Sequence, residues 1–231
     1  MEFFEAVEAR RSIRKFTSDP VPAEVVERAL DAAILAPNSS NTQTWNFYWV
    51  RSAEKKAELV KACFGQAAAR TAQELVVFVA DPALWKRSQQ PLVEFVEKVN
   101  APKAVIFYYK KLIPMTYRAG FLNLWGYFRA LTLWFSGLLR PVPRGPNTLR
   151  DLQEVAIKSS ALAAENFVLA MAAQGFSTCM MEGFDEVRVK KLLKLSGTAR
   201  VTMVVGMGKG TEAGTWGPRF RIPREWVIHH V

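Results

Sequence analysis

Four residues near the start of the chain could bind an anion. The stretch ARRSIRKF, residues 9–16, places Arg10, Arg11, Ser12 and Arg14 within five positions. Guanidinium groups match phosphate oxygens with two parallel hydrogen bonds, and a serine adds a hydroxyl or a backbone N–H. The alternative is a solvated helix end, because cations are favourable at a helix C-terminus, which would explain one or two of the arginines. The local sequence leaves both interpretations open.

A second polar stretch could bind the edge of a planar heterocycle. PNSSNTQTWNF, residues 37–47, offers hydroxyls and amides but no formal charge. Asn41 and Gln43 each carry donors and acceptors, as the edge of a flavin or a nucleobase requires. Asn and Ser also bond their own backbone in turns, and taken alone this turn chemistry is the favoured interpretation.

Three further candidates are weaker. Cys179 lies in a predicted buried strand, where cysteine is usually a small core residue. The sequence GMGKG, residues 206–210, resembles a glycine-rich phosphate loop, but no helix start follows it. Arg219 and Arg221 alternate in the stretch PRFRIP, so on a strand they would share one face and could share one anion.

Hydrophobic periodicity predicts the elements that position these residues. Helical spacing predicts helices over residues 2–11, 19–37, 52–64, 148–175 and 186–195. Apolar runs predict strands over residues 45–50, 75–80, 176–181 and 200–208, with a last strand over 225–231. Helices and strands are mixed, so the expected class is α+β or α/β.

Residues 84–147 carry no clear pattern except one long apolar stretch at 121–139. Its length approaches that of a membrane span, but Arg129 in its middle is costly in lipid. We therefore favour a buried or dimer-covering helical excursion. The alternative is an interfacial membrane helix, since Trp125 and Trp134 would suit one. The flanking basic residues also fit it, namely Lys110, Lys111, Arg118 and Arg140.

Composition sets wider bounds. The 231 residues are 50% hydrophobic and 12% aromatic, enough for a sizeable core. The net charge of +10 favours anionic partners such as nucleic acid, acidic membrane surfaces or phosphate-bearing ligands. Basic residues outside the motifs are dispersed rather than striped, which argues against nucleic acid. Two cysteines, no metal-site spacing and an acidic amphipathic start unlike a signal peptide predict a cytoplasmic protein without a metal.

Taken together, four separated motifs resemble the FMN-dependent nitroreductase family. In chain order they are RRSIRKF, APNSSNTQTWNF, GFSTCMMEGFD (residues 175–185) and GPRFRIPREWVI (residues 217–228). With the connecting helices, the resemblance covers most of residues 1–80 and 148–231. Residues 84–147 match poorly.

The resemblance implies a single α+β domain with a central mixed or antiparallel sheet, assembled as an intertwined homodimer with FMN at the interface. Residues 84–147 would be a helical excursion that lids the active site. The phosphate and ribityl end would be held by Arg10, Arg11, Ser12 and Arg14, with Arg219 and Arg221. Four loop residues would contact the flavin that is bound mainly by the other subunit, namely Asn38, Ser39, Asn41 and Gln43. The ring would face the backbone of Met181, Glu182 and Gly183, with one N–H directed at N5.

The implied activity is a ping-pong oxidoreductase reaction. NADH or NADPH would pass a hydride to flavin N5, and a nitroaromatic or quinone would then take it, with no side-chain acid or base required. Two alternatives remain: another flavin reductase chemistry such as dehalogenation, or a basic protein that associates with membrane surfaces through residues 110–140.

Overall fold

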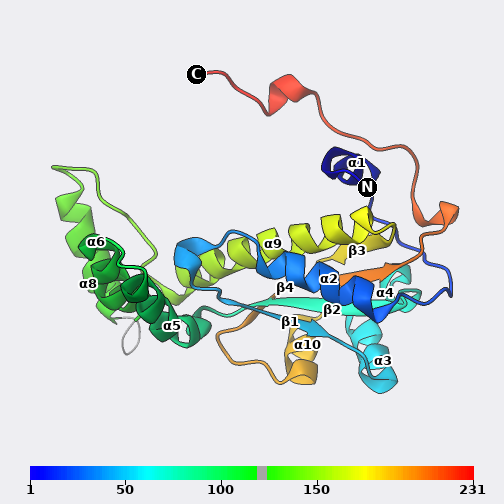
Figure 1. The fold of residues 1–231 in the computed structure, drawn as a ribbon, viewed down its shortest axis with the longest axis horizontal. Helices are drawn as coiled ribbons and strands as arrows, with labels where there is room; N and C mark the ends of the chain where they lie inside the picture. The colour runs from blue at the N-terminus through cyan, green and yellow to red at the C-terminus, as the bar shows by residue number, and fades with distance from the viewer. Residues whose placement is uncertain (119–123) are drawn as a thin grey trace.

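The structure is a computed structural model that describes residues 1–118 and 124–231. Its centre is a four-stranded antiparallel sheet in the order β1-β2-β4-β3 (Figure 1). The strands are β1 (Trp45–Trp49), β2 (Glu74–Ala80), β3 (Ser177–Met181) and β4 (Arg200–Gly208). The predicted α+β class is confirmed. A mixed or an antiparallel sheet was expected, and the sheet is antiparallel.

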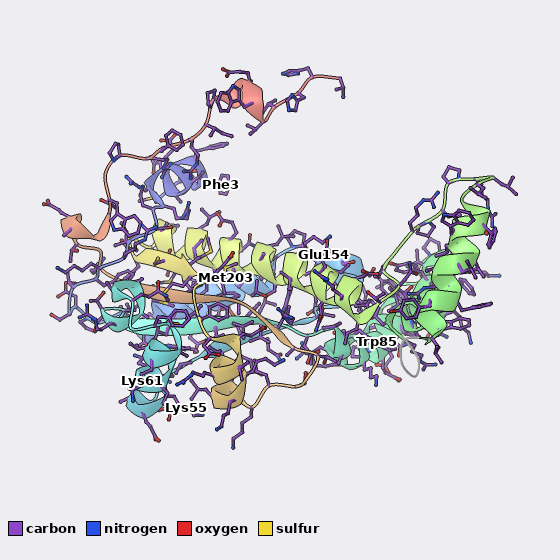
Figure 2. The ribbon with its side chains drawn as sticks, turned by 180° about the vertical axis from the view of Figure 1, so that it is seen from behind. Phe3, Lys55, Lys61, Trp85, Glu154 and Met203 are labelled. Atoms are coloured by element: carbon purple, nitrogen blue, oxygen red, sulfur yellow. The ribbon has the colours of Figure 1, made fainter. Side chains whose placement is uncertain are left out.

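Helices cover both faces of the sheet because side chains alternate along each strand. On one face, Phe78 of β2 packs against Phe167 of α9, with their ring centroids 5.4 Å apart. On the other face, Val77 of β2 shares a core with Leu59 of α3. The first layer is α2 (Ala23–Ile34) and α9 (Leu149–Ala173); the second is α3 (Ala53–Ala62), α4 (Ala67–Arg70) and α10 (Glu186–Leu193). Figure 2 shows Met203 of β4 inside these layers.

The longest helix, α9, is a core helix. Its Thr148 and Asp151 form a capping box at the start, and Gly175, at φ +77°, follows its end. Among the described helices it alone is long and apolar enough to cross a membrane, but half of its most apolar window is buried in the protein. Burial against the sheet accounts for its apolar composition.

A helical arm, residues 85–147, projects beyond one end of the sheet (Figure 1). It contains α5 (Trp85–Lys98), α6 (Lys103–Phe107), a π-helical turn (Tyr108–Leu112), α7 (Ile113–Tyr117) and α8 (Leu124–Ser136). The apolar stretch predicted at 121–139 is helical over α8, and its first three residues lie outside the described ranges. Of the two alternatives predicted for this stretch, burial inside the single chain is not found, because Gly126 is the one buried residue described in α8. The other alternative, that the stretch covers a dimer contact, stays a prediction.

The C-terminal tail passes the first helix of the chain. Helix α1 (Phe3–Ala9) packs on α9, and the tail from residue 209 runs past α1 and continues beyond it, so the C-terminus lies away from the N-terminus (Figure 1). The strand predicted over 225–231 is wrong: the tail has a 3-10 turn at Arg224–Trp226 and no strand beyond it. A strand needs a neighbouring strand to take its backbone hydrogen bonds, and none of the described strands lies beside this segment.

Candidate functional site

The arginine segment near the N-terminus lies along the outer edge of β3. Ser12 bridges to Thr178, and the Ile13 N–H donates to the Thr178 carbonyl at 2.9 Å. Helix α1 ends at Ala9 with no basic residue in its last turn, so the helix macrodipole does not account for the arginines that follow.

The C-terminal tail contacts this segment through side chains of both partners. Arg219 Nη2 donates to the Arg10 carbonyl at 2.6 Å, and Arg11 Nη2 donates to the Gly217 carbonyl at 2.6 Å. The Arg14 guanidinium lies 4.0 Å over the ring of Trp216. Arg221 donates instead to the adjacent Phe220 carbonyl, and no contact among the described residues joins it to this cluster.

The cluster fits a phosphate group. None of the ion pairs among residues 1–118 and 124–231 involves Arg10, Arg11, Arg14 or Arg219. A cavity of about 200 Å³ is lined by Arg10, Arg11 and the start of β3. Guanidinium groups gathered without a carboxylate repel one another, and a dianionic phosphate would remove that repulsion while accepting their hydrogen bonds.

Strand β3 links this cluster to the predicted ring-facing backbone. Met181 is three residues from Thr178, roughly 10 Å along an extended strand. Glu182 and Gly183 follow at the exposed end of the strand, where the Gly183 carbonyl accepts from Gln66 Nε2 at 2.8 Å. In one chain, the arginine segment therefore lies beside β3, and the Met181–Gly183 backbone lies at the end of the same strand.

The two remaining glycine and cysteine candidates are structural. Cys179 is buried as predicted, and burial raises the pKa of its thiol. A Cβ at Gly206 would lie 2.5 Å from the Ala68 carbonyl oxygen, and one at Gly208 would lie 3.0 Å from the Cβ of Phe16. These glycines therefore allow close packing, and the first three residues of GMGKG are the last three of β4.

The polar loop at residues 38–43 is a strained turn. Asn38 Oδ1 accepts from the Gln43 N–H at 2.9 Å, so the turn chemistry predicted for Asn is confirmed. Ser40, Asn41 and Gln43 have φ values of 54°, 50° and 48°. Non-glycine residues rarely adopt this region, and strain of this kind concentrates at functional sites.

Contacts from two helices hold the loop in place. Arg87 of α5 donates from Nη2 to the Gln43 and Trp45 carbonyls, each at 3.1 Å, and from Nη1 to Asn46 Oδ1 at 2.8 Å. The Ser39 N–H donates to Ser159 Oγ of α9 at 3.3 Å. Arg87 was not predicted from the sequence, because it is 44 residues from Gln43 along the chain and no local pattern links the two.

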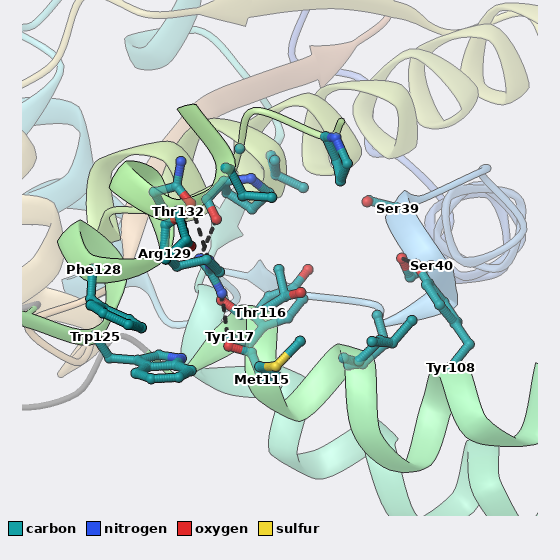
Figure 3. Close-up of a pocket in the computed structure, with 18 residues that line it drawn as sticks. Ser39, Ser40, Tyr108, Met115, Thr116, Tyr117, Trp125, Phe128, Arg129 and Thr132 are labelled. Carbon is teal, nitrogen blue, oxygen red and sulfur yellow. Dashed lines mark hydrogen bonds between the residues drawn. The ribbon is translucent and has the colours of Figure 1, made fainter. Parts of the chain in front are cut away.

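The loop forms one wall of a cavity of about 570 Å³, and the arm forms the others (Figure 3). Tyr108 O–H lies 2.5 Å from Ser40 Oγ, and Tyr117 O–H lies 3.1 Å from Thr42 Oγ1. Burial raises the pKa of Tyr117, so this side chain remains a neutral phenol at ordinary pH. The aromatic side chains lining the cavity are Tyr108, Tyr117, Trp125 and Phe128. The sequence analysis did not single out the tyrosines.

Arg129 is the polar anchor of the arm. Its guanidinium donates to the Met115 and Thr116 carbonyls at 2.8 and 3.2 Å, to the Pro146 carbonyl, and to Asn147 Oδ1 at 3.0 Å. Burial lowers the pKa of Arg129, and the nearby Asp151 carboxylate opposes that shift. The one arginine of the apolar stretch therefore joins α8 to α7 and to the start of α9.

The loop and the arginine cluster are not brought together within one chain. Ser39 contacts α9 at Ser159, whereas the small cavity at the arginines includes Ala172. These two positions are thirteen residues apart on α9, or about 20 Å at 1.5 Å per residue. A single chain therefore presents the loop and the arginine cluster at two separate places.

Among the described residues, no group of three or more His, Cys, Asp or Glu side chains could hold a metal ion.

Comparisons with known proteins identify the family of the chain. The family model described as the nitroreductase family matches residues 7–209. Protein DrgA of Synechocystis is 29% identical over 213 residues, which are 92% of this chain and 86% of that protein. NADH dehydrogenase of Thermus thermophilus is 27% identical over 219 residues, 95% of this chain and 91% of that protein.

A solved structure shares the fold and contains the predicted cofactor. A protein from Exiguobacterium sibiricum, determined in complex with FMN, is 24% identical, with a TM-score of 0.73 over 100% of this chain and 98% of that one. The prediction made from four short motifs is confirmed: the chain belongs to the nitroreductase family of FMN-dependent NAD(P)H oxidoreductases.

Proposed function

We propose that this protein reduces nitroaromatic or quinone-like acceptors with electrons from NAD(P)H. The observation that carries the proposal is the cavity of about 570 Å³ beside the 38–43 loop. Aromatic side chains form much of its lining, and such walls stack on planar rings. Its size is within the range of small-molecule sites.

FMN, if bound, would supply the redox chemistry that carries electrons from NAD(P)H to the acceptor, with solvent delivering the protons. Arg10, Arg11, Arg14 and Arg219 would hold its phosphate, and a backbone N–H near Glu182 would orient its ring. The arm acts as a lid that limits water around the acceptor. Rate enhancement then depends on positioning and on fixed dipoles rather than on a side-chain acid or base.

We infer that a second copy of the chain completes the site. The loop at 38–43 is about 20 Å along α9 from the arginine cluster, so one chain cannot apply both to a single flavin. Exposed apolar side chains on α1 and the tail support such an assembly. They include Phe3, Phe4, Val7, Trp216, Phe220 and Trp226.

The first test is the visible spectrum of the purified protein, before and after NADH or NADPH is added without oxygen. We expect a flavin spectrum that bleaches, and that recovers when a 1,4-naphthoquinone or a nitrobenzene is added. A colourless protein that does not bind added FMN would contradict the proposal. Recovery with a halogenated phenol, accompanied by halide release, and not with the first two acceptors would assign dehalogenation instead.

A further inference from the structure

Helix α8 exposes an apolar face that no described part of the chain covers. Trp134 and Phe135 are 51% and 57% exposed, and Leu139, just after the helix, is 92% exposed. The same surface includes Leu124, Tyr127, Phe128, Leu131 and Leu138. The one charged residue of α8, Arg129, turns inward to backbone carbonyls. A contiguous apolar face of this kind marks an interaction surface.

The chain's excess positive charge lies around this face. Between Lys98 and Arg150 there are nine of the 31 basic residues and none of the 21 acidic ones. This segment therefore carries +9 of the net charge of +10. Lys110 pairs with Glu97, which lies just before the segment. The rest of the chain is nearly neutral, so the arm is the part of the molecule that attracts anions.

The partner that binds the α8 face must match both its apolar side chains and the basic residues of the arm. Residues 85–147 carry ten basic and two acidic residues, so a second copy of the arm would bring two segments of charge +8 together, and their repulsion would oppose that contact. Nucleic acid would match the charge but would leave the leucines of α8 in water. An anionic lipid bilayer satisfies both, because its headgroups pair with Lys and Arg while its acyl boundary takes Leu, Phe and Trp.

We propose that α8 and its flanking basic residues dock the protein on the surface of an anionic lipid bilayer. The 13 residues of α8 are about 20 Å long, too short to cross a hydrocarbon core of about 30 Å, so the helix lies in the plane of the interface. Trp134, on the exposed face, would lie at the depth where indole rings concentrate in membranes. Lys111 before the helix and Arg140 after it contact headgroups.

Docking would place the mouth of the cavity against the lipid. Phe128 lines the cavity and is also 57% exposed on the α8 face. An apolar acceptor dissolved in the bilayer could then enter without crossing water. This corollary rests on the proposed function, whereas the docking itself can be tested without any acceptor.

The test is flotation of the full-length FMN-loaded protein with lipid vesicles. We expect binding to vesicles of equal phosphatidylglycerol and phosphatidylcholine at low salt, release at high salt, and much weaker binding to phosphatidylcholine alone. Failure to float with the anionic vesicles at low salt would overturn the proposal.

Two pairs of variants identify the surface. Trp134→Ser with Phe135→Ser should weaken vesicle binding at least about tenfold, while Phe64→Ser, an exposed phenylalanine after α3, should not. Lys111→Glu with Arg140→Glu should weaken it about 30-fold or more. The matched control is Lys55→Glu with Lys61→Glu on α3, far from the arm (Figure 2).

Sedimentation velocity of the same variants without lipid separates docking from self-association. We expect the arm variants to keep the oligomeric state and the flavin spectrum of the unsubstituted protein. If the Trp134 and Phe135 substitutions instead dissociate the protein while vesicle binding persists, a second copy covers α8 and the proposal is wrong. Equal loss of binding in the arm variants and the controls would also overturn it.

Discussion

Arg14 takes part in three contacts that join distant parts of the chain at the candidate phosphate site. Its backbone N–H donates to the Gly214 carbonyl at 2.8 Å, its guanidinium lies over Trp216, and Nη1 donates to the Ser12 carbonyl at 3.3 Å. Arg14→Ala should remove a charge-assisted contact to FMN phosphate worth about 1.5–3 kcal/mol. Fluorescence titration with FMN should then show affinity lower by about tenfold or more.

Arg51 provides the matched control for this substitution. Its guanidinium lies 4.7 Å over the ring of Trp49, so Arg51→Ala also removes an arginine–tryptophan contact but lies outside the cluster. FMN affinity should be unchanged in this variant. Unchanged affinity in Arg14→Ala as well would contradict the phosphate assignment.

The types of residue present were enough to predict an anion site, but the backbone conformation of the 38–43 loop and its contacts could not be predicted from the sequence. The density of arginines between Arg10 and Arg14 indicated an anion site because guanidinium chemistry is a property of the residue itself. The positive φ of Ser40 is different, since it depends on partners brought in by folding, such as Tyr108 from the arm. Arg87 was missed for the same reason.

At the scale of elements, the start of α9 links the core to the arm. Backbone N–H groups of Asn147 and Thr148 donate to the Asp151 carboxylate at 2.8 and 3.0 Å and hold its pKa below the ordinary value of 3.8. A lowered carboxyl pKa stabilises the fold above about pH 4, and this stabilisation is lost as pH falls through the folded-state pKa.

Asp151→Ala should therefore lower the free energy of unfolding by about 1 kcal/mol at pH 6. Urea denaturation should show that its difference from the unsubstituted protein shrinks between pH 4 and pH 2, because the carboxyl is then protonated. Glu154→Gln is the control, since Glu154 forms an exposed pair with Lys158 and should contribute little at either pH. A difference for Asp151→Ala that does not vary with pH would refute the role of the carboxylate charge.

Arg129 is expected to hold the arm closed. Arg129→Met keeps much of the side-chain length but leaves the Met115, Thr116 and Pro146 carbonyls without their donor. Each hydrogen bond to a charged group contributes about 1.5–3 kcal/mol, so local opening should rise tenfold or more. Limited digestion with chymotrypsin should cleave the arm faster and leave the sheet intact, whereas Arg118→Met, at an exposed arginine, should digest at the normal rate.

Elements were predictable where their own pattern decided the structure. Strand β2 is a continuous apolar run buried from Leu75 to Ala80, and α2 shows helical spacing ended by Pro37, so both were found. The prediction of a strand in the tail was wrong because Val227 and Ile228 have strand propensity but no neighbouring strand in the described chain. β propensity measures how well a side chain packs on a pleated sheet, so it predicts a strand only where a neighbouring strand is present.

At the scale of the whole molecule, the separation of the 38–43 loop from the arginine cluster predicts that FMN binding depends on assembly. Phe4 on α1 is 77% exposed, and a charge there would be costly at an apolar contact. Phe4→Glu should shift sedimentation velocity toward the monomer and lower FMN affinity together. Val187→Glu, at an exposed position on α10, is the control and should change neither. A monomeric Phe4→Glu protein that binds FMN normally would show that one chain suffices.

Arg87 also has a consequence for solubility. Strand β1 ends the sheet, and its sequence WNFYW has no charge and three bulky aromatic types, the kind of segment that pairs with its own copies into aggregates. The Arg87 guanidinium occupies the Trp45 carbonyl at this open edge and sets a positive charge beside it. In the folded protein, we therefore expect the residue that shapes the loop to disfavour pairing of this edge strand with other copies of the chain.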